Sequence, residues 1–152
     1  MSKTIPPVVI QQLVDATNAE LTRAFISNDI PAANLVQAMC APTGSRVICT
    51  PPVMDTDNDW LVFVPEDVLD FAQEFLAKLD ATYSEDQAHY PDGIVYWLGD
   101  LNIILLFDYP TFYRWVAATY YARLAGLNSK QARKDFFGAL IDMRPPIESL
   151  ML

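Results

Sequence analysis

Residues 44–64 constrain this chain more than any other stretch. A Gly-Ser pair opens the stretch, a proline-bearing loop follows, and three aspartates at alternate positions precede an apolar run at 60–64. The length and composition of that run predict a buried strand, because turn residues bound it. Side chains alternate between the two faces of a strand, so Asp57 and Asp59 are expected to point the same way, with Asp55 if the strand begins early.

Two carboxylates at alternate positions of an extended chain lie roughly 6.6 Å apart. Their repulsion amounts to about 2–3 kcal/mol at an effective dielectric constant of about 20, so a folded protein solvates them or places a cation between them. The pattern favours Mg²⁺, which one or two carboxylates commonly hold while waters and phosphates complete its shell. Gly44 would let the backbone approach a phosphate, and Ser45 can donate a hydrogen bond to it. The alternative is a solvated acidic turn before a strand.

Composition narrows the classes of partner. The 152 residues are 52% hydrophobic, which predicts one domain with a real core, and the net charge of −9 argues against direct binding to nucleic acids. A small-molecule ligand, a metal or a basic protein partner fits that charge. No signal peptide is visible, and the most apolar stretch, 94–107, is too short to span a bilayer, so we expect a cytoplasmic protein without a membrane partner.

Catalysis by a nucleophile and a histidine finds no support. His89 is the only histidine and stands in a polar segment before a proline. Cys40 and Cys49 flank the Gly-Ser pair and are expected to be reduced thiols, since no nearby histidine completes a zinc site.

The periodicity of apolar residues predicts an α+β fold, a small mixed sheet of about four strands packed with about four helices. Helices are expected at 8–27, 65–79, 112–125 and 130–141, strands at 35–39, 57–64, 94–98 and 101–107, and loops at 46–54 and 80–91. A tight turn at Gly99-Asp100 would join the last two strands. The whole chain, 1–152, is expected to be one domain with an N-terminal helix (1–34), a sheet that carries the site (35–108), C-terminal helices (109–144) and a tail (145–152).

The Gly44-Ser45-Arg46 motif, Thr50 and the Asp-x-Asp strand resemble the nucleotidyltransferase superfamily that includes DNA polymerase β. Small members of that superfamily carry Gly-Ser, a spacer, and Asp-x-Asp followed by aliphatic residues. The later segments 99–104, 112–119 and 127–133 resemble a narrower group, the small nucleotidyltransferase-like proteins encoded by tailed bacteriophages. Together the two resemblances extend over residues 36–140 and imply the minimal nucleotidyltransferase fold.

The resemblance implies a role for each residue of the motif. Asp57 and Asp59 would hold Mg²⁺, which bridges the triphosphate of a nucleotide, for transfer of a nucleotidyl group to a hydroxyl acceptor. Gly44 and Ser45 would hold the β- and γ-phosphates. Arg46 would be a further phosphate contact, or else a surface charge.

The chain departs from the superfamily at one important place. Active members have a third carboxylate on a neighbouring strand, and the matching position here is Asn102, which is expected to contact the nucleotide. Asp100 stands two residues earlier and is expected to share its face, so it could serve as third metal ligand or as base. Asn58 stands between the two aspartates where an apolar residue is usual, and Cys49 stands where glycine is common.

Two other functions stay open. The first is an inactive acidic phage protein that binds and inhibits a host protein in the host cytoplasm, as a DNA mimic or anti-defence factor. The second is a nucleotide sensor that binds without turnover. Convergence of Asp57, Asp59 and Asp100 would favour nucleotide chemistry, whereas an acidic stripe away from the Gly-Ser pair would favour mimicry.

Overall fold

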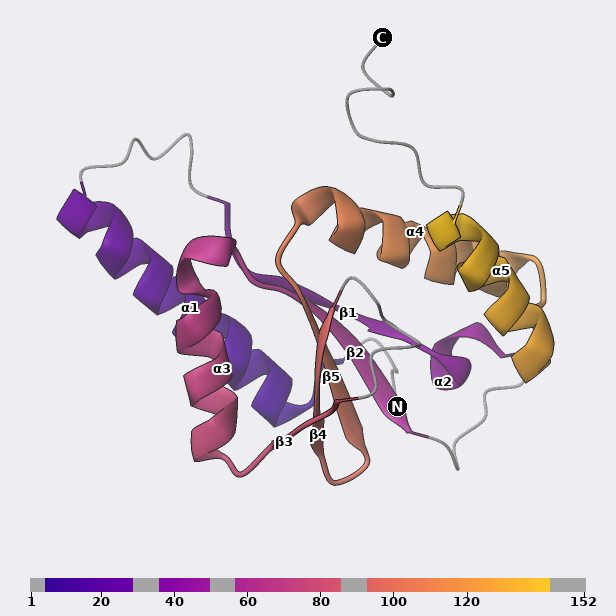
Figure 1. The fold of residues 1–152 in the computed structure, drawn as a ribbon, viewed down its shortest axis with the longest axis horizontal. Helices are drawn as coiled ribbons and strands as arrows, with labels where there is room; N and C mark the ends of the chain where they lie inside the picture. Colours follow the sequence, from indigo (N-terminus) through magenta and orange to yellow (C-terminus); the bar gives the residue numbers. More distant parts are fainter. Residues whose placement is uncertain (1–4, 29–35, 50–56, 86–92, 143–152) are drawn as a thin grey trace, which may run out of the picture.

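The computed structural model describes residues 5–28, 36–49, 57–85 and 93–142. A five-stranded mixed sheet lies between two groups of helices, with α1 and α3 on one side and α4 and α5 on the other (Figure 1). The elements follow one another along the chain as α1 (Val8–Asn28), β1 (Met39–Thr43), α2 (Ser45–Ile48), β2 (Asn58–Phe63), the 3₁₀ turn η2 (Glu66–Val68), α3 (Leu69–Lys78), β3 (Thr82–Tyr83), β4 (Ile94–Leu98), β5 (Leu101–Leu106), α4 (Tyr109–Leu124) and α5 (Lys130–Asp142).

The strand order in the sheet is β1-β2-β5-β4-β3. The central strands β2 and β5 run parallel, and the other neighbours are antiparallel. Every residue of β5 is buried, as expected for a strand with helices on both faces. The parallel pairing of β2 and β5 sets Asp59 opposite Asn102, so the acidic motif and the later polar position meet in the middle of the sheet.

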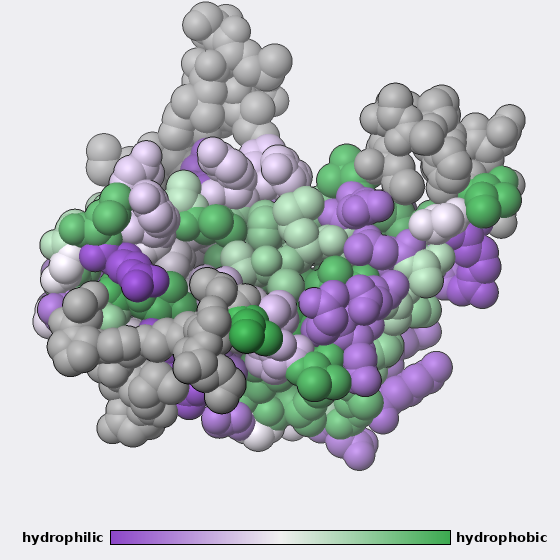
Figure 2. Space-filling view, turned by 180° about the vertical axis from the view of Figure 1, so that it is seen from behind, coloured by the Kyte–Doolittle hydropathy of each residue, from purple (hydrophilic) through white to green (hydrophobic). Residues whose placement is uncertain are grey.

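Strand alternation divides the core into two clusters. Trp60 and Val62 of β2 pack with α1 and α3, whereas Leu61 and Phe63 pack with Trp115 and its neighbours on the side of α4. Asp59 is therefore on the α4 side. Viewed from behind, the strongly hydrophilic residues gather on the side of α1 and α3 (Figure 2). In the described ranges, no helix is long and apolar enough to cross a membrane.

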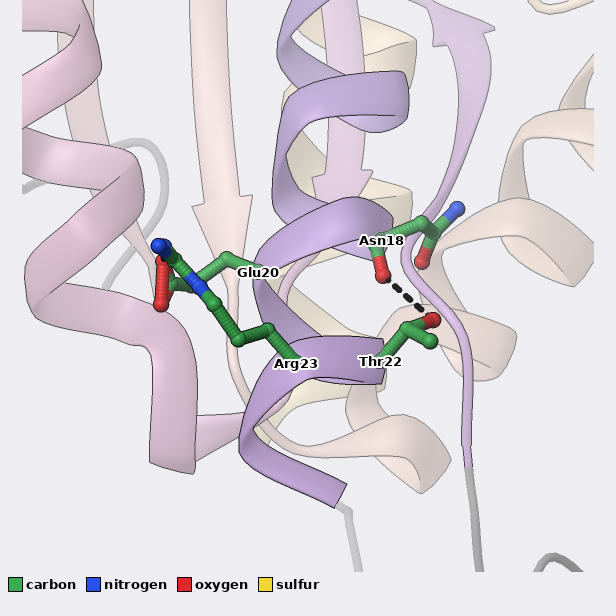
Figure 3. Close-up of polar contacts among 4 residues, drawn as sticks. All are labelled: Asn18, Glu20, Thr22 and Arg23. Carbon is green, nitrogen blue, oxygen red and sulfur yellow. Dashed lines mark hydrogen bonds and ion pairs between the residues drawn. The ribbon is translucent and has the colours of Figure 1, made fainter. Parts of the chain in front are cut away.

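Asn18 on α1 fixes where the first strand begins. Its side chain accepts a hydrogen bond from the Ala38 amide at 2.7 Å and donates one to the Ala38 carbonyl at 3.2 Å. Figure 3 shows Asn18 also accepting, through its backbone carbonyl, a hydrogen bond from Thr22, while Glu20 and Arg23 pair on another face of the helix. Because both polar backbone groups of Ala38 are already paired, ladder pairing starts at the next residue.

The α+β class is confirmed, with five strands where about four were predicted. The first strand is Met39–Thr43 and not 35–39, for the reason just given. The predicted loop at 46–54 begins as the short helix α2, since the Gly44 carbonyl accepts from the amides of Val47 and Ile48. The predicted loop at 80–91 contains the strand β3, two exposed residues paired with β4.

The later elements agree more closely with the predictions. The hairpin of β4 and β5 is confirmed, and Gly99 at its turn has a φ of 64°. Helix α4 begins three residues before the predicted position because Asp108 caps it. The Asp108 carboxylate accepts hydrogen bonds from the amide of Thr111 at 3.0 Å and from its hydroxyl at 2.6 Å.

Candidate functional site

The Gly-Ser bend lies directly against the acidic strand. Gly44 follows β1 with φ 81° and ψ −171°, a conformation that only glycine adopts readily. A Cβ atom built on Gly44 would lie 2.0 Å from Oδ2 of Asp59, so the carboxylate fills the space that a side chain would need. The antiparallel register, which sets Thr43 opposite Asp59, brings the bend to this place.

Asn102 holds the other oxygen of the same carboxylate. Its Nδ2 donates a hydrogen bond of 2.9 Å to Oδ1 of Asp59, across the parallel pair β2 and β5. The Asn102 residue is only 5% exposed, and its Oδ1 has no hydrogen-bond partner among the described residues. A buried amide oxygen without a donor is uncommon in folded proteins and indicates a place where a ligand or water donates.

The surroundings of Asp59 make it a weaker acid than usual. The pKa of Asp59 is raised from the ordinary value of 3.8 to about 6, mainly by burial and to a lesser degree by the nearby charge of Asp57. The hydrogen bond from Asn102 and the positive charge of Arg46 act in the opposite direction. Burial prevails because the carboxylate loses its water and receives one side-chain donor in exchange.

The other predicted carboxylates of the site, Asp57 and Asp100, are exposed to solvent. Asp57 is exposed and immediately precedes β2. Asp100 stands in the turn before β5, and its side chain is 75% exposed and pairs with Arg46 at 3.5 Å. Asp100 therefore does not lie in a strand beside Asn102, although its carbonyl accepts a hydrogen bond from the Asn58 amide. Asp55 and Thr50 lie outside the described residues, as does His89.

The oxygen atoms of the site match what Mg²⁺ binds, although they are few. Across the ranges that the structure describes, no group of three or more His, Cys, Asp or Glu side chains could hold a metal ion. Two carboxylates, from Asp57 and Asp59, and the unpartnered Oδ1 of Asn102 are the oxygen atoms that could act as ligands there. This set fits one Mg²⁺ completed by waters and ligand phosphates, and does not fit an ion held by protein groups alone.

Several contacts that support the site were not evident from the sequence. The hydroxyls of Thr43 and Thr119 share a buried hydrogen bond of 2.7 Å, which ties the end of β1 to α4. Such a contact joins positions 76 residues apart and leaves no local pattern. Asn58, where an apolar residue was expected, accepts a hydrogen bond of 3.0 Å from the Trp60 indole, so a polar residue serves the packing there.

Cys49 stands where glycine is common in the superfamily, and it takes part in hydrogen bonds that join the end of α2 to α5. Its buried sulfur lies 2.9 Å from Nη1 of Arg133, and the same nitrogen donates to the carbonyls of Leu127 and Asn128 at 3.2 and 2.8 Å. Arg133 is thus used in holding the α4–α5 connection against the end of α2.

Similarity to known proteins was found among solved structures. No protein family model matches the sequence, and no curated protein matches it. Among solved structures, one that matches is the terminal uridylyl transferase 4 from Trypanosoma brucei with bound UTP and UpU. The match has a TM-score of 0.39 at 16% sequence identity, over 78% of this chain and 43% of that one, so this chain spans less than half the length of that protein.

Proposed function

We propose that this chain is a nucleotidyltransferase-like protein that binds a nucleoside triphosphate together with Mg²⁺ at the bend between β1 and α2. The observation that supports this most directly is the contact between Gly44 and the Asp59 carboxylate. The contact sets the Gly-Ser bend directly against a carboxylate that lacks enough donors.

Each residue of the proposed site has one task. Asp57 and Asp59 would hold the ion, which when bound would neutralise the triphosphate and polarise its phosphorus centre. Gly44 and Ser45 would hold the β- and γ-phosphates, with the Ser45 hydroxyl as a hydrogen-bond donor. Asn102 orients Asp59 through its Nδ2 and offers its free Oδ1 to a donor on the ligand, such as a sugar hydroxyl.

Transfer of the nucleotidyl group is the more specific part of the proposal. The acceptor hydroxyl must lose a proton, and Asp100 is the further carboxylate near the bend that could take it. Asp100 is paired with Arg46, and the buried position opposite Asp59 is the amide of Asn102. This observation favours a second candidate, a sensor that binds the triphosphate without turnover.

The non-enzymatic alternative has one feature in its favour. Four acidic residues of η2 and α3 are exposed on the side of the sheet away from Asp59: Glu66, Asp67, Asp70 and Glu74. A basic protein partner would fit that face. An interaction protein needs no triphosphate, so a test of triphosphate binding separates this function from the transferase and the sensor.

Isothermal titration calorimetry with each of the four common ribonucleoside triphosphates tests the proposal. With Mg²⁺ present we expect at least one to bind, and the double variant Asp57→Ala with Asp59→Ala to lose that binding. The matched control is Asp67→Ala with Asp70→Ala, which removes the same charge from the opposite side of the sheet and should bind normally. Absence of heat for all four triphosphates would contradict both the transferase and the sensor readings.

Turnover is measured separately, with a triphosphate labelled on its α-phosphate. Release of pyrophosphate together with a labelled acceptor would support transfer. Binding that leaves the triphosphate intact over many hours would identify a sensor.

A further inference from the structure

The outward face of α4 carries large side chains that are well exposed in the described structure. Tyr109, Tyr113, Tyr120 and Leu124 are 44, 64, 61 and 66% exposed. Their spacing of four, seven and four residues places them on one face of the helix, over roughly 22 Å of its length. Tyr121 is exposed beside Tyr120, and the two rings meet edge to face at 6.0 Å. A contiguous exposed row of this kind indicates an interaction surface.

The charge of the same segment is opposite to that of the rest of the chain. Residues 109–134 contain five Lys and Arg and no Asp or Glu, whereas the remainder holds five basic and all 19 acidic residues. The expectation against nucleic-acid binding came from the total charge, which conceals this division.

Four of these basic residues are available to a partner. The ion pairs within the described ranges involve Arg23 and Arg46 as the basic partners, and Arg133 is bonded to backbone carbonyls. The remaining basic residues have no ion pair in that part of the chain: Arg114, Arg123, Lys130 and Lys134.

We propose that this surface, the outward face of α4 with the basic residues beside it, binds single-stranded nucleic acid. Aromatic rings on which bases stack, alternating with cations that meet phosphates, are how proteins bind single strands without sequence preference. Tyr113 is followed by Arg114, and Arg123 stands three residues after Tyr120, so a ring and a guanidinium recur along the helix.

The carboxylates on the side of α1 and α3 do not prevent this binding. The carboxylates of α1 and α3 lie across the sheet, roughly 20 Å from the outer face of α4 if each layer is about 10 Å thick. The Debye length is about 8 Å at physiological ionic strength, so their repulsion is largely screened at that distance.

Fluorescence anisotropy with labelled twelve-nucleotide oligouridine and oligothymidine tests the proposal, and the two strands distinguish RNA from DNA. No Mg²⁺ or triphosphate is present, so the result does not depend on the function proposed above. We expect binding that weakens about tenfold or more in Tyr113→Ser with Tyr120→Ser. Arg123→Gln with Lys130→Gln should lower the slope of log affinity against log salt by about 0.7 for each lost phosphate contact.

The matched controls are Tyr83→Ser on the exposed edge strand β3 and Lys78→Gln at the end of α3, which should bind as the unaltered protein does. Circular dichroism of each variant verifies the fold. No anisotropy change with either strand at low salt would overturn the proposal, as would tyrosine variants that bind normally. A dimer seen by light scattering that the tyrosine variants dissolve, without strand binding, would instead assign this face to a second copy of the chain.

Discussion

Replacing Asp59 by asparagine should make the protein more stable at neutral pH while removing its proposed metal ligand. The pKa of Asp59 is raised from 3.8 to about 6, which corresponds to about 3 kcal/mol of unfavourable burial once the group is ionised. The folded protein binds this proton more tightly than the unfolded chain does. The contribution of this carboxyl group to stability is therefore greatest below pH 3.8 and is lost as the pH rises to about 6.

The amide of Asp59→Asn carries no charge and so avoids this penalty. It retains an oxygen that can accept the hydrogen bond from Nδ2 of Asn102. We expect the free energy of unfolding to rise by about 2–3 kcal/mol at pH 8, and by only about 1 kcal/mol at pH 4.5, where protonation already relieves much of the penalty.

Urea denaturation followed by circular dichroism, at several pH values between these limits, measures the difference. Asp57→Asn is the matched control, because it removes the same charge two residues earlier at an exposed position and should change stability by less than about 0.5 kcal/mol. The reasoning would be refuted if Asp59→Asn lowered stability at pH 8, or if its effect were the same at every pH.

Three further predictions concern the contacts that build the site. Gly44→Ala should destabilise the fold by about 1–3 kcal/mol, and by less in an Asp59→Ala background, where the clash with Oδ2 is gone. A double-mutant cycle measured by urea denaturation tests this, and a coupling energy of zero between the two positions would contradict the described contact. Thr119→Val should lower the unfolding free energy by about 1–3 kcal/mol by leaving the Thr43 hydroxyl unpaired, and adding Thr43→Val should restore part of the loss. Asn18→Ala should lower it by about 1–2 kcal/mol and accelerate amide hydrogen exchange in β1, whereas unchanged exchange would show that Asn18 does not fix the strand.

The sequence was informative where a local rule decides the structure. The apolar run before Pro65 gave β2, and the Gly99-Asp100 turn between two apolar runs gave the hairpin. The start of β1 could not be found in this way, because it depends on Asn18, which is 20 residues from Ala38. The strand β3 was missed since two exposed residues at a sheet edge show no periodicity.

Of the candidate site, the contact between the Gly-Ser bend and Asp59 was predictable from the sequence, and the arrangement of Asn102 and Asp100 was not. The bend and Asp59 are joined by the antiparallel pairing of β1 and β2, which short spacing along the chain favours. The alternation rule extended from Asn102 back to Asp100 fails because it applies within a strand, and the chain turns at Gly99-Asp100 before β5 begins. The partner of Asp59 is therefore the amide of Asn102, and Asp100 faces outward to Arg46.

Without a ligand, the pair formed by Asp59 and Asn102 lowers the stability of the folded state, and this favours a binding role for the pair. Ionised, Asp59 is buried with one side-chain donor, and beside it Oδ1 of Asn102 has none among the described residues. A ligand could supply a cation to the Asp59 carboxylate and a hydrogen-bond donor to Oδ1 of Asn102. Because such a ligand binds only the folded state, its binding would stabilise the fold. Proteins commonly accept lower stability at the place where they bind, because groups poised for a ligand are incompletely satisfied without it. The same buried carboxylate that makes Asp59→Asn stabilising thus favours a ligand site here over an acidic turn left to solvent.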